Sequence, residues 1–340
     1  MTIEPRPPAG GTASLHQLWT AAMLLALAAA LLIVLLRQIR VSDLAQLAGR
    51  LSAGQLGLLC AIYALTTWLR GIRLGLLIGD RSSVSLAAVS GVHAFLNHVA
   101  PLRLGELSLP VLAKFFLRRE LTRGSVALVV MRLYDVFAIA LLILLAVLAV
   151  GAGLTSTYRL AGVLAGGVLL AAGALGLRLL PAVLAGGGRV AARALRALSR
   201  GLAGPANRLE RAGAEMATQV SGLPPALRYA ALPAVSVLIQ LSVYLFFYLS
   251  MVFMGIDLGF FLNTLASSGE LITGLLPINA IGSVGTLEAG WAVGFVLCGV
   301  GRAPAIASGF VMHGIILVTA FTLAVAGSVW LLAVREKRGA

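Results

Sequence analysis

The sequence predicts an all-α protein, a polytopic bundle of transmembrane helices that contains two oppositely oriented re-entrant hairpins with broken helices. The first observation is composition: 60% of the 340 residues are hydrophobic and 11% are charged, whereas soluble domains are about 45–50% apolar and about 25% charged. The second is a series of apolar runs, several of about 20 residues, the length of a helix that crosses a bilayer. Strand-type alternation is missing, which argues against a membrane barrel.

The apolar runs form one predicted transmembrane domain, residues 18–334, with polar ends. Residues 1–17 are rich in Pro and Gly and are predicted to be disordered, and 335–340 form a basic tail. The first run has no convincing small-residue cleavage site, so we expect a retained span and not a signal peptide. The runs are 18–36, 56–69, 84–100, 125–150, 158–177, 229–254, 258–276, 286–300 and 304–334.

Basic residues gather at 70–83, 114–123, 178–228 and in the tail. Because short loops rich in Arg and Lys remain in the cytoplasm, all four segments are expected on the cytoplasmic side, although the basic residues of 37–50 then lie outside. The same bias accounts for the net charge of +14. No motif that reads bases is present, so nucleic acid is not an expected partner. The Ala-, Leu- and Arg-rich composition favours a multi-pass protein of a bacterial inner membrane.

This orientation predicts the two hairpins. If 70–83 and 114–123 lie on one side, residues 84–113 must enter the membrane and return. Counting membrane crossings in the same way places both ends of 258–300 on the opposite side, so this segment is predicted to be a hairpin from the opposite face. The two tips can then meet near the midplane.

The basic segment 181–228 has two open interpretations. Arg189, Arg193, Arg196 and Arg200 recur at a spacing of three or four, which is typical of a helix with a basic face lying on an anionic membrane surface. An ordinary cytoplasmic connection that follows the charge rule fits equally well.

The first broken segment contains Asn97, Pro101, Arg103, Gly105 and Glu106. Proline interrupts helical hydrogen bonding, and glycine permits close approach of backbone or ligand. A guanidinium group suits a phosphate, and a helix that begins near the proline directs its positive end toward an anion. The residues therefore indicate an anion site, or alternatively an Arg103–Glu106 pair that only fixes the hairpin.

The second broken segment has a polar helical stripe, which is formed by Asn263, Ser267, Glu270 and Gly274. After it comes a turn with further candidate residues, Pro277, Asn279, Gly282, Gly285 and Glu288. Glu288 can stabilise a helix N-terminus, pair with a basic group of the first hairpin, or act as a protonatable carboxylate. Glu270 lies among apolar neighbours, where a charge is costly and is usually functional.

Arg132 and Asp135, three residues apart in one apolar run, complete the candidate set. They can pair within their helix, with or without a part in the site. His93 and His98 are five apart and do not share a helix face, so no metal site is expected. No catalytic, nucleotide or dinucleotide motif is present, so we expect neither catalytic residues nor a cofactor.

Three motifs in this order resemble the flippase-like membrane family that includes the transmembrane region of lysylphosphatidylglycerol synthases. They are Asn97 with Pro101-x-Arg103-x-Gly105-Glu106; Arg132-x-x-Asp135; and Pro277 followed by Gly282-Ser283-x-Gly285-x-x-Glu288. The resemblance covers about residues 15–334 and implies a membrane domain that handles lipid. No aminoacyl-transferase domain follows the last run, so synthase activity is not expected.

The expected function is therefore translocation or binding of an anionic phospholipid or a polyprenyl-phosphate-linked lipid. Arg103 would engage the head group between the hairpin tips, while Glu106, Glu270 and Glu288 balance its charge. One alternative is a non-transporting accessory subunit of a lipid or envelope pathway, with lipid-synthesis enzymes as partners. The other is an intramembrane enzyme that acts on lipid head groups with these carboxylates.

Overall fold

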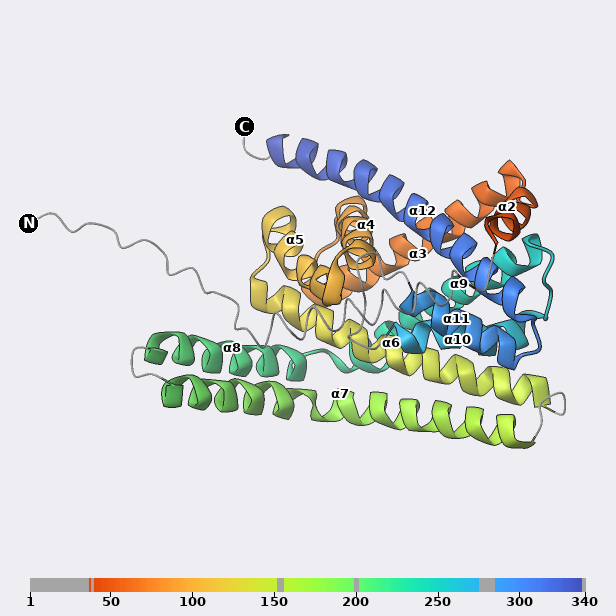
Figure 1. The fold of residues 1–340 in the computed structure, drawn as a ribbon. Coiled ribbons are helices and arrows are strands. Elements are labelled where there is room, and N and C mark those ends of the chain that lie inside the picture. The colour runs from red at the N-terminus through yellow and green to blue at the C-terminus, as the bar shows by residue number, and fades with distance from the viewer. Residues whose placement is uncertain (1–36, 38–39, 152–155, 199–201, 275–284, 338–340) are drawn as a thin grey trace, which may run out of the picture.

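The computed structural model describes residues 37, 40–151, 156–198, 202–274 and 285–337. Within these ranges every regular element is helical, which confirms the predicted all-α class (Figure 1). The first half contains α2 (Val41–Gly49), α3 (Ala53–Ile78), α4 (Ser83–Val99), the 3-10 helix η1 (Pro101–Leu107), α5 (Ser108–Leu117) and α6 (Leu121–Val150). The second half contains α7 (Ser156–Leu198), α8 (Ala203–Ser221), the π-helical turn η4 (Leu227–Ala231), α9 (Leu232–Phe253), α10 (Phe260–Thr273), α11 (Thr286–Leu297) and α12 (Arg302–Lys337).

Five of the described helices are long and apolar enough to cross a membrane. They include α3, α6, most of α7, the continuous helix formed by η4 and α9, and α12. All predicted apolar runs except 18–36, which lies outside the described residues, coincide largely with helices. The chain is therefore a multi-pass helical membrane protein.

The first broken segment is a helical hairpin. Helix α4 ends before Pro101, and the helical structure that begins at the proline is divided into η1 and α5. A Cβ atom on Gly105 would overlap the backbone of Leu96 and Asn97, so the glycine lets η1 pack directly on the end of α4. At the open end of the hairpin, where α4 begins and α5 ends, Arg119 donates to the Gly79 carbonyl at 3.1 Å. The turns before α4 and after α5 therefore lie together.

The second broken segment has α10 and α11 as its legs, packed closely against one another. Gly294 on α11 lies so near the backbone of Ala266 on α10 that a Cβ atom would overlap it, and Gly290 lies similarly near Gly269. Helix α10 ends at Thr273, and residues 275–284 lie outside the described part. Entry of either hairpin into a membrane, and from which face, stays a prediction.

One expectation about the basic segments is wrong. We expected Arg70 and Arg73 in a cytoplasmic loop, but α3 continues through both and ends at Ile78, where Gly79 caps it in the left-handed conformation with φ 67°. Only the turn 79–82 remains as the loop. The helix continues because the Arg73 charge is neutralised inside the bundle, at 3% exposure, and does not need water.

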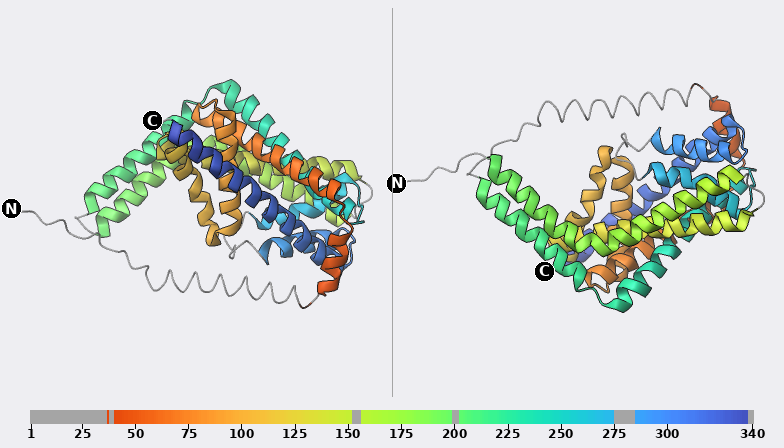
Figure 2. Two further views of the ribbon diagram at one scale, coloured as in Figure 1. Left: turned by 90° about the horizontal axis from the view of Figure 1, so that it is seen from above. Right: turned by 90° about the horizontal axis from the view of Figure 1, so that it is seen from below.

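The described residues of the basic segment 181–228 are mostly helical. Helix α7 runs through Pro181 to Leu198, and α8 packs alongside it; the two helices contact α6 at one end, and the other end of the pair extends away from the remaining helices (Figure 2, green). Arg189 and Arg193 are exposed on this extension, and Arg196 pairs with Glu210 at 2.6 Å. The basic helical face is therefore present, and its contact with a membrane surface stays a prediction.

Candidate functional site

A polar cavity of about 200 Å³ lies between α3, α4, α6, α9 and α10. Both broken segments reach it, α4 with its C-terminal end and α10 with its last turn. Three arginines and two carboxylates contribute to its wall. The principal polar lining residues are Arg70, Arg73, His93, Asn97, His98, Arg132, Asp135, Gln240 and Glu270.

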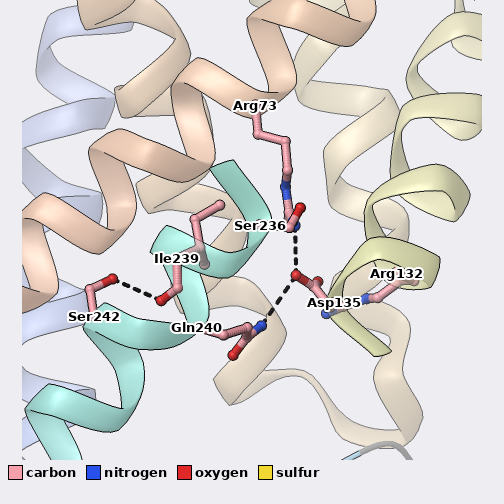
Figure 3. Close-up of polar contacts among 7 residues, drawn as sticks. All are labelled: Arg73, Arg132, Asp135, Ser236, Ile239, Gln240 and Ser242. Atoms are coloured by element: carbon pink, nitrogen blue, oxygen red, sulfur yellow. Dashed lines mark hydrogen bonds and ion pairs between the residues drawn. The ribbon is translucent and has the colours of Figure 1, made fainter. Parts of the chain in front are cut away.

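The best-connected group in the wall is the Asp135 carboxylate on α6. Its Oδ1 atom lies 2.6 Å from Nη1 of Arg73 and accepts from Nε2 of Gln240 at 3.2 Å (Figure 3). The same Nη1 atom of Arg73 donates to the Ser236 hydroxyl at 2.9 Å. These four residues come from three helices, and burial in low dielectric strengthens their interactions. They fix the relative positions of α3, α6 and α9.

Arg132 connects this network to the first hairpin. Its Nη2 atom lies 3.1 Å from Oε1 of Glu106 in η1, and its Nη1 atom lies 3.8 Å from Oδ2 of Asp135. The intrahelical Arg132–Asp135 contact is thus longer than the Arg73–Asp135 bond. Glu106 does not line the cavity itself, and it contacts the site through its ion pair with Arg132.

Arg70 has no ion pair in the described structure, although it lines the cavity. Of the 12 acidic residues of the chain, all except Glu4 lie in the described ranges. The Arg70 charge still acts electrostatically on Asp135 and Glu270. A cation is therefore available in the cavity.

Glu270 on α10 also lines the cavity and is 7% exposed. Asn263, Ser267 and Glu270 are all buried, so the polar stripe of α10 faces the interior as its spacing indicates. The Oε2 atom of Glu270 has no hydrogen-bond partner among the described residues.

Several other buried polar atoms of the wall also lack a partner within the described ranges. Such atoms are uncommon in protein interiors, and each costs about 1–3 kcal/mol. They include both donors and acceptors: Arg73 Nε, Arg132 Nε, Asn97 Oδ1 and Gln240 Oε1. The cavity can therefore hold a polar ligand.

Glu288 lies away from this wall, at the start of α11. Its Oε2 atom accepts from the backbone N–H of Gly285 at 2.7 Å, and its Oε1 atom lies 2.6 Å from Nδ1 of His313 on α12. Gly285 adopts φ 93°, a conformation that favours glycine. Helix capping thus accounts for one oxygen of Glu288, and the hydrogen bond with His313 accounts for the other.

The candidate residues divide into three groups. The first group lines the cavity and consists of Asn97, Arg132, Asp135 and Glu270. The second supports the cavity wall and consists of Gly105 and Glu106. The third lies at the start of α11 and consists of Gly285 and Glu288. Pro101 and Arg103 belong to η1, where their side chains are not described. Pro277, Asn279 and Gly282 lie outside the described residues.

The sequence prediction missed Arg70, Arg73 and Gln240 as lining residues, and it considered His93 and His98 only as metal ligands. A signal for the two arginines existed. The apolar residues Leu74–Ile78 continue the helical run beyond Arg73, which is typical of arginines inside a helix. Within the described ranges no group of three His, Cys, Asp or Glu residues could hold a metal ion.

The fold and the cavity define a class: a multi-pass helical membrane protein with a buried, arginine-rich polar site between two broken helical elements. The family model for the lysylphosphatidylglycerol synthase transmembrane region matches residues 20–324. The chain therefore belongs to that family, as the three sequence motifs predict. Neither a curated protein nor a solved structure matches the chain.

Proposed function

We propose that this protein is a lipid translocase of the inner membrane, and that the cavity binds the head group of an anionic phospholipid or polyprenyl-phosphate-linked lipid. The observation that supports this most strongly is Arg70, a cavity cation without a carboxylate partner in the described structure. Arg70 is half-buried, and a partly buried charge is screened less by water and salt than a charge on the surface. A lipid phosphate would supply the missing counter-ion.

The chemistry of the wall fits a phosphate in particular. A guanidinium group presents a planar set of donors that matches phosphate oxygens, and Arg132 Nε is a further buried donor without a partner in the described part. Arg103, in the 3-10 helix beside the cavity-lining end of α4, remains a proposed second ligand. The acyl or prenyl chains would stay in the lipid outside the small cavity.

The two broken segments suggest how a head group would pass. Each contributes one end to the cavity wall, and neither is a continuous helix across the bundle. Movement of one hairpin would open the cavity toward one side of the membrane, and movement of the other would open it toward the opposite side. The proposal includes no catalytic step, because it needs only binding and release.

A head-group accessibility assay in proteoliposomes tests this function, with Arg70→Gln and Arg103→Ala as variants and Arg189→Gln on the exposed face of α7 as the matched control. We expect each cavity variant to slow translocation of labelled phosphatidylglycerol by at least about tenfold, since about 1.4 kcal/mol of lost binding gives that factor. Unchanged translocation in both variants would overturn the proposal.

Other outcomes of the same experiments separate the alternatives. Lipid that stays bound through purification, identified by mass spectrometry, combined with no translocation by the wild-type protein, would indicate an accessory subunit. Co-purification with a lipid-synthesis enzyme would support that role further. Turnover of a lipid donor would indicate an intramembrane enzyme.

A further inference from the structure

A second buried polar group lies beside the cavity and takes no part in the proposed head-group contacts. It consists of His313 on α12 and Glu288 on α11, which are 3% and 1% exposed. Their closest atoms, Nδ1 and Oε1, are 2.6 Å apart. This pair joins the second hairpin to the last helix of the chain.

The hydrogen bonds of the pair account for one shared proton. The other oxygen of Glu288 already accepts from the Gly285 N–H. At 2.6 Å a proton must lie between Nδ1 of His313 and Oε1 of Glu288, because two bare lone pairs would repel at that distance. The Nε2 atom of His313 then remains as a position at which the pair can take up a further proton.

That Nε2 atom is buried and has no hydrogen-bond partner among the described residues. A purely structural His–Glu contact uses the second ring nitrogen in a further bond, as oriented histidines commonly do. Here a position for a proton is available on the side of the ring that Glu288 does not occupy.

His98 connects this pair to the cavity. It lines the cavity wall, and its ring centroid lies 6.3 Å from that of His313. Nε2 of His98 also lies 3.5 Å from the Tyr63 hydroxyl. One imidazole of the cavity wall therefore lies next to the imidazole that contacts Glu288.

The charged and titratable groups around the pair come from every helix that packs near it. Glu270 on α10 interacts electrostatically with both His313 and Glu288. On α3 they are Arg70 and Tyr63, and on α4 His98. On α6 Arg132 acts electrostatically on His98, as Arg70 does. On α9 Tyr244 hydrogen-bonds Ser268 beside Glu270.

We propose that the His313–Glu288 pair is a proton-binding site that is thermodynamically coupled to the head-group cavity. This inference rests on the proposed function and adds the ion that would be exchanged. A proton that enters from the cavity binds Nε2 of His313, while the proton between Nδ1 and Glu288 stays in place. The pair changes from a net charge of −1 to 0, no bond between heavy atoms changes, and deprotonation returns the same proton.

The coupling follows from this change in charge. An anionic phosphate in the cavity is repelled less when the nearby pair is neutral overall, so proton uptake strengthens head-group binding. By reciprocity, head-group binding must take up protons. A proton gradient would then bias the side on which lipid is bound and the side on which it is released.

Calorimetric titration of the purified protein with short-chain phosphatidylglycerol tests the coupling. Titrations in buffers of different ionisation heat measure the protons taken up per lipid, between about pH 5 and 8, where histidines change charge. We expect uptake of a fraction of a proton, at most about one, and an affinity that falls by up to about tenfold per pH unit as pH rises. Binding without proton uptake by the wild-type protein overturns this inference alone.

Two variants assign the site. His313→Gln can still hydrogen-bond Glu288 but cannot take up a proton, so it should bind lipid with an affinity nearly independent of pH and with little uptake. Ser308→Ala is the matched control, because it removes another buried contact of α11 and α12, the 3.1 Å bond from Trp291 Nε1, without a titratable group; it should behave like the wild type. Undiminished proton uptake in His313→Gln overturns the assignment, and absence of lipid binding by the wild type at every pH overturns the proposed function together with it.

Discussion

Nη1 of Arg73 lies 2.6 Å from Oδ1 of Asp135, across the interface of α3 and α6. The two residues are 62 positions apart in the chain. Both are almost fully buried, and Ser236 and Gln240 on α9 complete the hydrogen bonds of the pair. This contact holds together the three helices that form one side of the cavity.

Removing one partner of this pair should destabilise the protein strongly. Asp135→Asn leaves the Arg73 charge buried without its main counter-ion, and such a loss costs about 3–5 kcal/mol. Unfolding in detergent, followed by circular dichroism, measures the change. The control is Glu210→Gln, which breaks the exposed pair with Arg196 and should cost at most about 1 kcal/mol. Equal losses in the two variants would contradict the role of burial.

The close packing of α10 on α11 should not tolerate a methyl group at Gly294. A Cβ atom there would overlap the carbonyl of Ala266, so Gly294→Ala forces the helices apart and should cost about 1–3 kcal/mol. Gly167→Ala on α7 is a suitable control because its Cβ position has nothing within 4 Å. That variant should be neutral or stabilising by about 1 kcal/mol, since Ala favours a helix over Gly. A stable Gly294→Ala protein would show that the two helices can separate freely.

The turn contact at the ends of the first hairpin should depend on acid pH. Burial tends to raise the pKa of Asp80, but hydrogen bonds from Ser82 and the Arg119 charge outweigh it and hold that pKa below its ordinary value. A lowered folded-state pKa gives stability that is present above the unfolded value, about 3.9, and is lost as pH falls through the folded value. Unfolding of wild type and Asp80→Asn across this range should show their difference shrinking toward acid pH. A constant difference would contradict the ionic origin of the contact.

Glu270 should oppose binding of a purely anionic head group. Its carboxyl group lines the same cavity as Arg70, so Glu270→Gln removes a repulsive charge wherever that group is ionised and should tighten binding of short-chain phosphatidylglycerol severalfold in alkaline buffer. Equilibrium titration measures the change, with Asp257→Asn in the exposed turn before α10 as the control. Weaker binding in Glu270→Gln would instead show that this carboxylate accepts a hydrogen bond from the ligand.

The helices and part of the site follow from local patterns in the chain. The apolar runs and their interruptions predict α4, α6, α9, α10 and α12, and the Pro101–Glu106 region is interrupted as expected. Asn97, Arg132, Asp135 and Glu270 were recognisable as site residues because polar groups within apolar runs are costly in lipid. Arg73 was not recognised as a site residue, because an arginine near the end of an apolar run usually marks the cytoplasmic end of a helix. Only its contact with Asp135 shows that it lies inside the bundle.

The sequence by itself thus determined the all-α membrane class, the two interrupted segments and the family, since hydropathy, proline and glycine act on the chain locally. Tertiary structure alone decided the partners: Asp135 with Arg73, Glu106 with Arg132, and Glu288 with His313. An ion pair depends on distance through space between helices that are far apart in the chain. Local pattern therefore predicts which residues are buried and charged, and only packing decides which of them meet.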